Sequence, residues 1–127
     1  MKVVINVTAE DIKNGKYQDA IKCVIALALA RDLKKYSKVF KFEDFDSASV
    51  HLTRKSDDKR FAINVSKKAS AFAARFDAIE DLSWDLEGKK LKEKQAKKRA
   101  ALKPFKFTFD IPDEIFQKVE KQEAVNV

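Results

Sequence analysis

Apolar and polar residues alternate in several short segments of the chain, which is typical of β-strands with one buried face. The clearest case is 105–111, where three phenylalanines and an isoleucine take every second position. The polar run 55–59 separates two alternating segments, so we predict a hairpin there. The pattern predicts five strands, at 2–7, 38–45, 47–54, 60–66 and 105–111.

Two helices are predicted between the first and second strands. Thr8 with Asp11 three residues later forms a variant of the capping box, and Gly15 ends the short helix that follows. A second helix is expected over 19–35, because Ala and Leu dominate the apolar run at its centre.

Helical periodicity returns after the fourth strand. Phe72, Phe76 and Ile79 recur at i, i+4 and i+7, which predicts a core-facing stripe on a helix over about 67–82, capped by Ser66 or Ser70. A basic helix is expected at about 84–103, where Pro104 ends it, and a short terminal helix over 113–121.

The order of these elements is β-α-β-β-β-α-α-β, which predicts an α+β fold. A chain of 127 residues fits one domain. We therefore expect a single domain over 1–127, built on a mostly antiparallel sheet of about four to five strands with helices packed on one face. The basic helix at about 84–103 is interpreted as an insertion in it.

The most apolar stretch, 20–30, holds Cys23. A membrane-spanning helix needs about 20 apolar residues, and this run is about half that length, so we expect no membrane association. A helix that is apolar nearly all round is a central one, which predicts that Cys23 is a buried, inert thiol. Lys22 and a helix start near Asp19 leave a reactive thiol as the alternative.

Cysteine usage and the N-terminal residues bear on the cellular compartment. One cysteine can form neither an intramolecular disulfide nor a cysteine-based zinc site. The N-terminal apolar run turns polar within eight residues, too early for a secretory leader. Both features favour a reducing cytosol and a cytoplasmic protein.

The charge of the chain is concentrated in one segment. The chain carries 27 bases and 20 acids, a net charge of +7, and outside 89–103 it has 19 of each. The excess bases are the candidate contacts for nucleic acid or another anion: Lys89, Lys90, Lys92, Lys94, Lys97, Lys98, Arg99 and Lys103. Leu91 and Leu102, near one stripe with Gln95 and Lys98, are the apolar contacts expected of the helix.

Three interpretations of this basic helix stay open. It can be a solvated helix, or one neutralised by the five acids between 77 and 87. It can bind the phosphates of a nucleic acid or nucleotide, where lysines favour backbone contact over base reading. It can also bind an acidic protein surface.

Enzyme motifs are missing from the sequence. His51 is the single histidine, and two glycines cannot build a phosphate-cradling loop. Acidic residues at 43–46 and 110–114 could converge on Mg²⁺, but such groups are common at turns and helix starts. We therefore predict no catalytic residue, no metal site and no cofactor.

Four segments of the chain resemble a family of small uncharacterised proteins encoded by tailed bacteriophages: "INVTAEDIKNG", "CVIALALA", "FAINVSKKASAFAARFDA" and "PFKFTFDIP". The matching positions are Thr8, Ile12, Gly15, Cys23, Ala26, Phe72, Phe76, Asp77, Pro104, Phe105 and Phe107. Val24 stands where the family has proline, and the stretch 83–103 is longer than its usual connection. The resemblance implies a phage protein that acts in the host bacterial cytoplasm, and it implies no reaction.

The sequence therefore predicts a non-catalytic phage accessory protein for host takeover or counter-defence, which binds nucleic acid or a nucleotide through its basic helix. The alternative is a protein–protein inhibitor of a host or bacterial defence factor, with the basic helix on an acidic protein surface. Phe40, Phe42 and Phe45, together with strand edges, are candidate contacts for such a protein.

Overall fold

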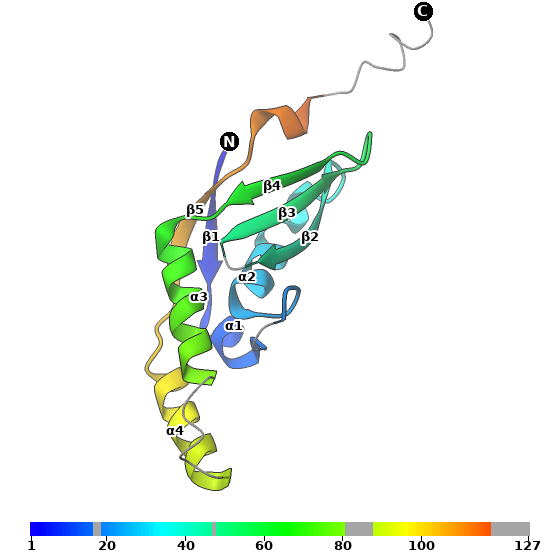
Figure 1. Ribbon diagram of the computed structural model, residues 1–127. Helices are drawn as coiled ribbons and strands as arrows, with labels where there is room; N and C mark the ends of the chain where they lie inside the picture. The colour runs from blue at the N-terminus through cyan, green and yellow to red at the C-terminus, as the bar shows by residue number, and fades with distance from the viewer. Residues whose placement is uncertain (17–18, 47, 81–87, 118–127) are drawn as a thin grey trace, which may run out of the picture.

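The computed structural model describes residues 1–16, 19–46, 48–80 and 88–117, and it confirms the α+β class. The strands form two antiparallel sheets instead of one. β1 (Lys2–Val7) pairs with β5 (Phe105–Asp110), and β2 (Phe40–Asp46), β3 (Ser49–Arg54) and β4 (Arg60–Asn64) form a meander (Figure 1).

A central helix explains why there are two sheets. The apolar helix α2 (Val24–Asp32) contacts β1 of one sheet and β2 of the other, as well as α1 (Ala9–Asn14) and α3 (Lys67–Glu80). A helix that is apolar on most sides needs a partner on each of them, and a single flat sheet covers only one side.

The alternation in the sequence sets the faces of β1 and β5. Val3, Ile5, Phe107 and Phe109 are buried on the inner face, and Ile5 lies opposite Phe107 in the register. The N-terminus is held beside β5, because its ammonium group donates to the carbonyl of Ile111 at 2.7 Å.

The meander is tied to the rest of the domain through the buried Arg54 of β3. Its guanidinium makes two hydrogen bonds to Asp57 in the β3–β4 turn, at 2.9 and 2.8 Å, and donates to the carbonyl of Glu114 at 2.6 Å. Glu114 belongs to the 3₁₀ helix η2 (Asp113–Phe116), which stands where the sequence predicts a terminal helix. The remainder of that prediction, 118–121, lies outside the described residues.

The phenylalanines of β2 are core residues. Phe40 and Phe45 are buried, and Phe42 is half-buried against the same core. The prediction that they form an exposed contact for a protein partner is therefore wrong. A bulge between Phe42 and Asp44 lets both Phe40 and Phe45 face inward, which strict alternation over an odd spacing does not allow.

The capping box of α1 is confirmed and extended by an ion pair. The Thr8 hydroxyl accepts from the backbone of Asp11, and the Asp11 carboxylate accepts from the backbone of Thr8. Arg31 of α2 donates to the same carboxylate at 2.8 and 2.9 Å and also bonds the carbonyl of Asn6. The pair of Asp11 and Arg31 thus joins β1, α1 and α2.

Helix α2 is shorter than the predicted 19–35. Cys23 is its N-cap, and its Sγ accepts from the backbone of Ala26 at 3.4 Å. The preceding residues form a turn, because the Asp19 carboxylate accepts from the backbone N–H groups of Ile21 and Lys22. After Asp32 the chain tightens into the 3₁₀ helix η1 (Lys34–Tyr36). Cys23 therefore lies at the start of the helix and not within it, and it is half-buried where the sequence predicted a buried thiol.

The third helix carries the predicted stripe. Ala69, Phe72, Phe76 and Ile79 are all buried on α3, and Ser66 is the cap, since its hydroxyl accepts from the backbone of Ala69 at 3.3 Å. The basic segment forms α4 (Gly88–Ala100). In Figure 1 this helix lies beyond the end of α3 and away from both sheets. Residues 84–87 of the predicted basic helix lie outside the described residues.

Candidate nucleic-acid interface

Helix α4 exposes its lysines on nearly every side. Every lysine in it is exposed, and so is Lys103 in the segment that leads to β5. The exposed lysines are Lys89, Lys90, Lys92, Lys94, Lys97, Lys98 and Lys103. Together with Arg99 they make up the predicted set of contacts, and we call these eight residues the basic arm.

A narrow stripe holds α4 against the domain. Leu91, Gln95 and Arg99 recur every four residues and are half-buried, as is Leu102 just after the helix. The predicted stripe had Lys98 in place of Arg99, and that position is wrong. Lys98 is exposed, whereas Arg99 faces the body.

Arg99 contacts the body of the domain and holds α4 in place. Its guanidinium lies 4.7 Å from the ring centre of Phe76 in α3, a cation–π geometry. One of its N–H groups donates to the carbonyl of Lys13 in α1 at 3.3 Å. The planar guanidinium does both at once, which a lysine ammonium at the same position could not.

The tertiary structure adds a base to the arm that sequence reasoning missed. Lys13, at the end of α1, lies beside Arg99 on a groove of about 350 Å³ between α1 and α4. The rest of the groove is lined by Ala9, Ile12, Ala96, Ala100 and Leu102. Lys13 is remote from α4 in the sequence, and no pattern in the chain indicates that the two helices meet.

Charge on α4 itself is almost uncompensated. The helix carries seven bases, and its one acid, Glu93, lies 4.0 Å from Lys89. Of the acids between 77 and 87 that could neutralise the arm, Asp77 lines the cavity beside Cys23 and makes interactions of its own, and 81–87 lie outside the described residues. A dense row of exposed lysines is suited to contact with a polyanion, because contact with phosphates releases their counterions.

The single histidine is part of a sheet-surface cluster. His51 Nδ1 bonds the Asp44 carboxylate, and Arg60 lies 3.6 Å from the same carboxylate. The nearby Ser49 hydroxyl bonds Asn64 at 3.2 Å. The Asp–His pair thus has no nucleophile bonded to it among the described residues, so the cluster has no catalytic relay there.

The carboxylates that could have held Mg²⁺ do not converge. In the first group, Asp44 is bound to His51, and Glu43 lies 3.8 Å from Lys41. In the second group, Asp113 bonds the N-terminal ammonium at 3.1 Å. Lys59 bonds Glu114 at 2.6 Å and lowers the pKa of that carboxyl. Within the described ranges, no three histidine, cysteine or acidic side chains are placed to bind a metal.

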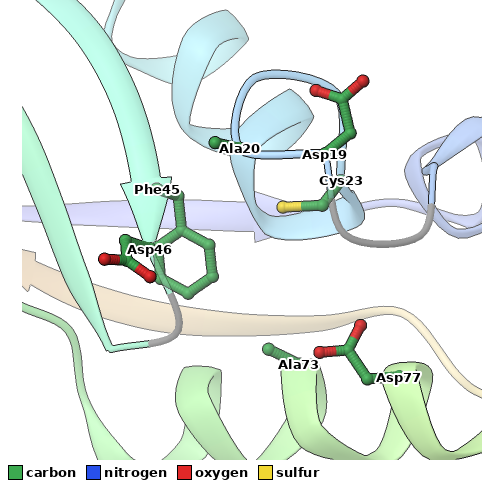
Figure 2. A pocket seen from close by; sticks show the side chains of 7 residues that line it. All are labelled: Asp19, Ala20, Cys23, Phe45, Asp46, Ala73 and Asp77. Atoms are coloured by element: carbon green, nitrogen blue, oxygen red, sulfur yellow. The ribbon is translucent and has the colours of Figure 1, made fainter.

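A second cavity, of about 230 Å³, surrounds Cys23. Figure 2 shows Cys23 and Asp19 on one side of it, Asp77 and Ala73 of α3 across from them, and Asp46 at the end of β2. Burial raises the pKa of the Cys23 thiol, and the carboxylates of Asp77 and Asp19 raise it further. The N–H groups of Ala26 and Ile25 at the helix start lower that pKa, but burial outweighs them.

We predict that the Cys23 thiol labels at least about tenfold more slowly in the native protein than in denaturant at neutral pH, because the thiolate is the reactive form. Its labelling rate should rise with pH only above the range in which an ordinary thiol ionises. Asp77→Asn should move that rise to lower pH by removing a neighbouring negative charge. Native labelling as fast as in denaturant would show that the thiol is exposed and reactive.

Comparison of the chain with family models, with characterised protein sequences and with solved structures finds no significant match to any of them. In the part of the chain that the structure describes, no helix has the length and apolar character to cross a membrane. The function is therefore argued from the basic arm itself.

Proposed function

We propose that this protein is a non-catalytic nucleic-acid-binding protein that holds phosphates with the basic arm. The observation that carries the proposal is the run of exposed lysines on α4, a helix that projects beyond the body of the domain. A bacteriophage origin and a role in host takeover or counter-defence are part of this proposal. They rest on the family resemblance alone.

The length of the arm favours a polymer over a free nucleotide. The 13 residues of α4 span about 20 Å at 1.5 Å per residue. A nucleotide has a compact group of phosphates and needs side chains that converge on it, whereas the lysines of α4 diverge along and around the helix. A nucleic acid presents phosphates over the whole length of the arm.

The spacing of the α4 lysines costs the helix some of its own stability. Lys90, Lys94 and Lys98 follow one another at four-residue spacing, where like charges destabilise a helix by about 0.2–0.5 kcal/mol per pair. A bound polyanion relieves this repulsion. The arm is thus arranged at a cost to its own stability, which supports a role in binding.

The test is the salt dependence of binding to a labelled DNA duplex, measured by fluorescence anisotropy between about 50 and 200 mM salt. Replacing Lys94, Lys97 and Lys98 by glutamine should lower the slope of log affinity against log salt by up to about 2.7, since each lost phosphate contact accounts for about 0.9. Arg99 is left unchanged in this variant, because its loss would also release α4 from α1 and α3.

A matched control removes the same charge far from the arm. Lys34 of η1, Lys38 and Lys55 are exposed, and the backbone N–H of Lys55 donates to the carbonyl of Val39, which follows Lys38 in the chain. The β3–β4 turn, which begins after Arg54, lies at the opposite end of the molecule from α4 (Figure 1). Their triple glutamine variant should keep the wild-type slope. If both variants lower the salt slope equally, net charge alone explains the effect, and the proposal that the basic arm is the binding surface is contradicted.

The alternative, an inhibitor that binds an acidic protein, predicts a different result. The wild-type protein would then bind no nucleic acid at low salt, and it would retain a single host protein from a nuclease-treated bacterial lysate. Because Phe40 and Phe45 are buried in the core, the basic arm and the strand edges are the surfaces that remain for that partner. The same triple variant should weaken capture of a partner that binds through the arm.

A further inference from the structure

We infer that the preferred ligand of the basic arm is duplex DNA, with α4 lying in the major groove between the two phosphate backbones. This inference rests on the proposed function and names its substrate class. Two observations support it: the distribution of bases around α4, and the burial of the nearby aromatic rings beneath cationic side chains.

The bases flank the packed stripe on both sides. At about 100° per residue, Lys89 and Lys92 fall on one side of the stripe and Lys94 and Lys98 on the other, so the lysines cover an arc of about 240°. A single strand offers one row of phosphates to a helix. The major groove offers two rows, one on each side, and the two flanks of α4 match them.

The dimensions agree with this placement. The major groove of B-form DNA is about 12 Å wide and admits an α-helix, whose diameter with side chains is about 10–12 Å. The helix projects from the domain, and among the described residues it is held along its narrow stripe, with the lysines of both flanks exposed. Duplex RNA has a deep and narrow major groove that side chains cannot read, which excludes the same fit.

Among the described residues, the surroundings of α4 do not favour a single strand. Proteins that bind single strands stack bases on open aromatic faces. The phenylalanines of the α3–β5 region near α4 are covered by cations instead: Arg99 lies 4.7 Å from Phe76, Arg75 lies 5.8 Å from Phe72, and Lys68 lies 5.5 Å from Phe105. Phe72 and Phe76 are also buried. The large apolar residues exposed in the described part of the chain are Met1, Val4 and Ile21, none of them aromatic.

The arm should bind without sequence preference. Its exposed bases are all lysines, which act as point charges, and the arginine that could read guanine edges is engaged with Phe76 and Lys13. Phosphate contact therefore provides the affinity, and groove shape provides the choice of duplex.

The experiment compares the full chain on duplex DNA, single-stranded DNA and duplex RNA of one sequence, each about two helical turns long. We expect duplex DNA to bind at least about tenfold more tightly than the other two at about 0.1 M salt. Single-stranded DNA or duplex RNA bound as tightly as duplex DNA would overturn the inference but leave the proposed function standing. Binding to none of the three would overturn both.

Two double variants test the flanks. Lys89→Gln with Lys92→Gln, and Lys94→Gln with Lys98→Gln, should each lower the salt slope on duplex DNA by up to about 1.8. A loss confined to one pair would show one-sided contact with a single backbone and contradict groove insertion. Glu93→Gln gives the opposite sign, because it removes the acid of α4, and it should raise duplex affinity. Circular dichroism of each variant confirms that α4 is retained.

Discussion

Replacing Leu29 with alanine should lower the free energy of unfolding by about 2–5 kcal/mol, the usual range for a core leucine. Leu29 is completely buried on α2, the helix that contacts both sheets and two other helices. The cavity left by the lost side chain would lie where these layers meet, and the surrounding strands and helices cannot all move in to fill it.

Leu27 is the matched control for this prediction. It lies on the same helix but is only half-buried, so part of its side chain stays in contact with water in the folded protein. Leu27→Ala should therefore cost less than Leu29→Ala, although the chemical change is identical. Urea unfolding followed by circular dichroism measures both. Equal losses, or a larger loss for Leu27, would contradict the orientation of α2.

A single added methyl group at Gly15 should also be strongly destabilising. A Cβ built there would lie 2.8 Å from the backbone nitrogen of Val24, would clash with the Val24 side chain, and would lie 3.0 Å from the carbonyl oxygen of Asp11. Two of these contacts are with backbone, so α1 and the start of α2 would have to separate. We expect Gly15→Ala to cost about 1–3 kcal/mol or more, the range for an overpacked site.

Gly88 provides the contrasting case. Its φ is +54°, and a Cβ there would meet nothing within 4 Å. Gly88→Ala should cost only the local strain of the left-handed region, about 1–2 kcal/mol, and Gly88→Asn less, because asparagine tolerates that region. We expect Gly15→Asn to unfold at a lower urea concentration than Gly88→Asn. Equal unfolding midpoints would show that the close approach of Val24 and Asp11 is not the reason for glycine at position 15.

Local patterns were sufficient for most of the secondary structure. Alternation located all five strands, and the Thr8–Asp11 box and the Phe72–Phe76 stripe located α1 and α3. These signals work because the side-chain period of a strand or helix is a property of neighbouring residues. The predicted start of α2 was wrong, because a pattern of neighbouring residues does not show which backbone groups a side chain will bond. Residues 20–22 belong to the apolar run, yet the Asp19 carboxylate accepts from the backbone N–H groups of Ile21 and Lys22 and holds the segment in a turn.

The location of the basic arm could be predicted from the sequence, but the role of each of its residues could not. The sequence shows by itself that all the excess positive charge lies in 89–103, because charge is counted along the chain and needs no partner. The role of each base within the arm depends on what lies beside it. Arg99 packs and Lys98 does not, since Phe76 of α3 and the carbonyl of Lys13 both face position 99.

The sequence alone determined the α+β class, the strands and helices it is built from, and the location and sign of the charged arm. Tertiary structure decided that β1 pairs with β5 from the far end of the chain, that the strands divide into two sheets around α2, and that Lys13 joins the arm. These features depend on contacts between distant residues. Any buried strand offers the same backbone hydrogen bonds and similar apolar side chains, so the choice of partner is made only when the whole core packs together.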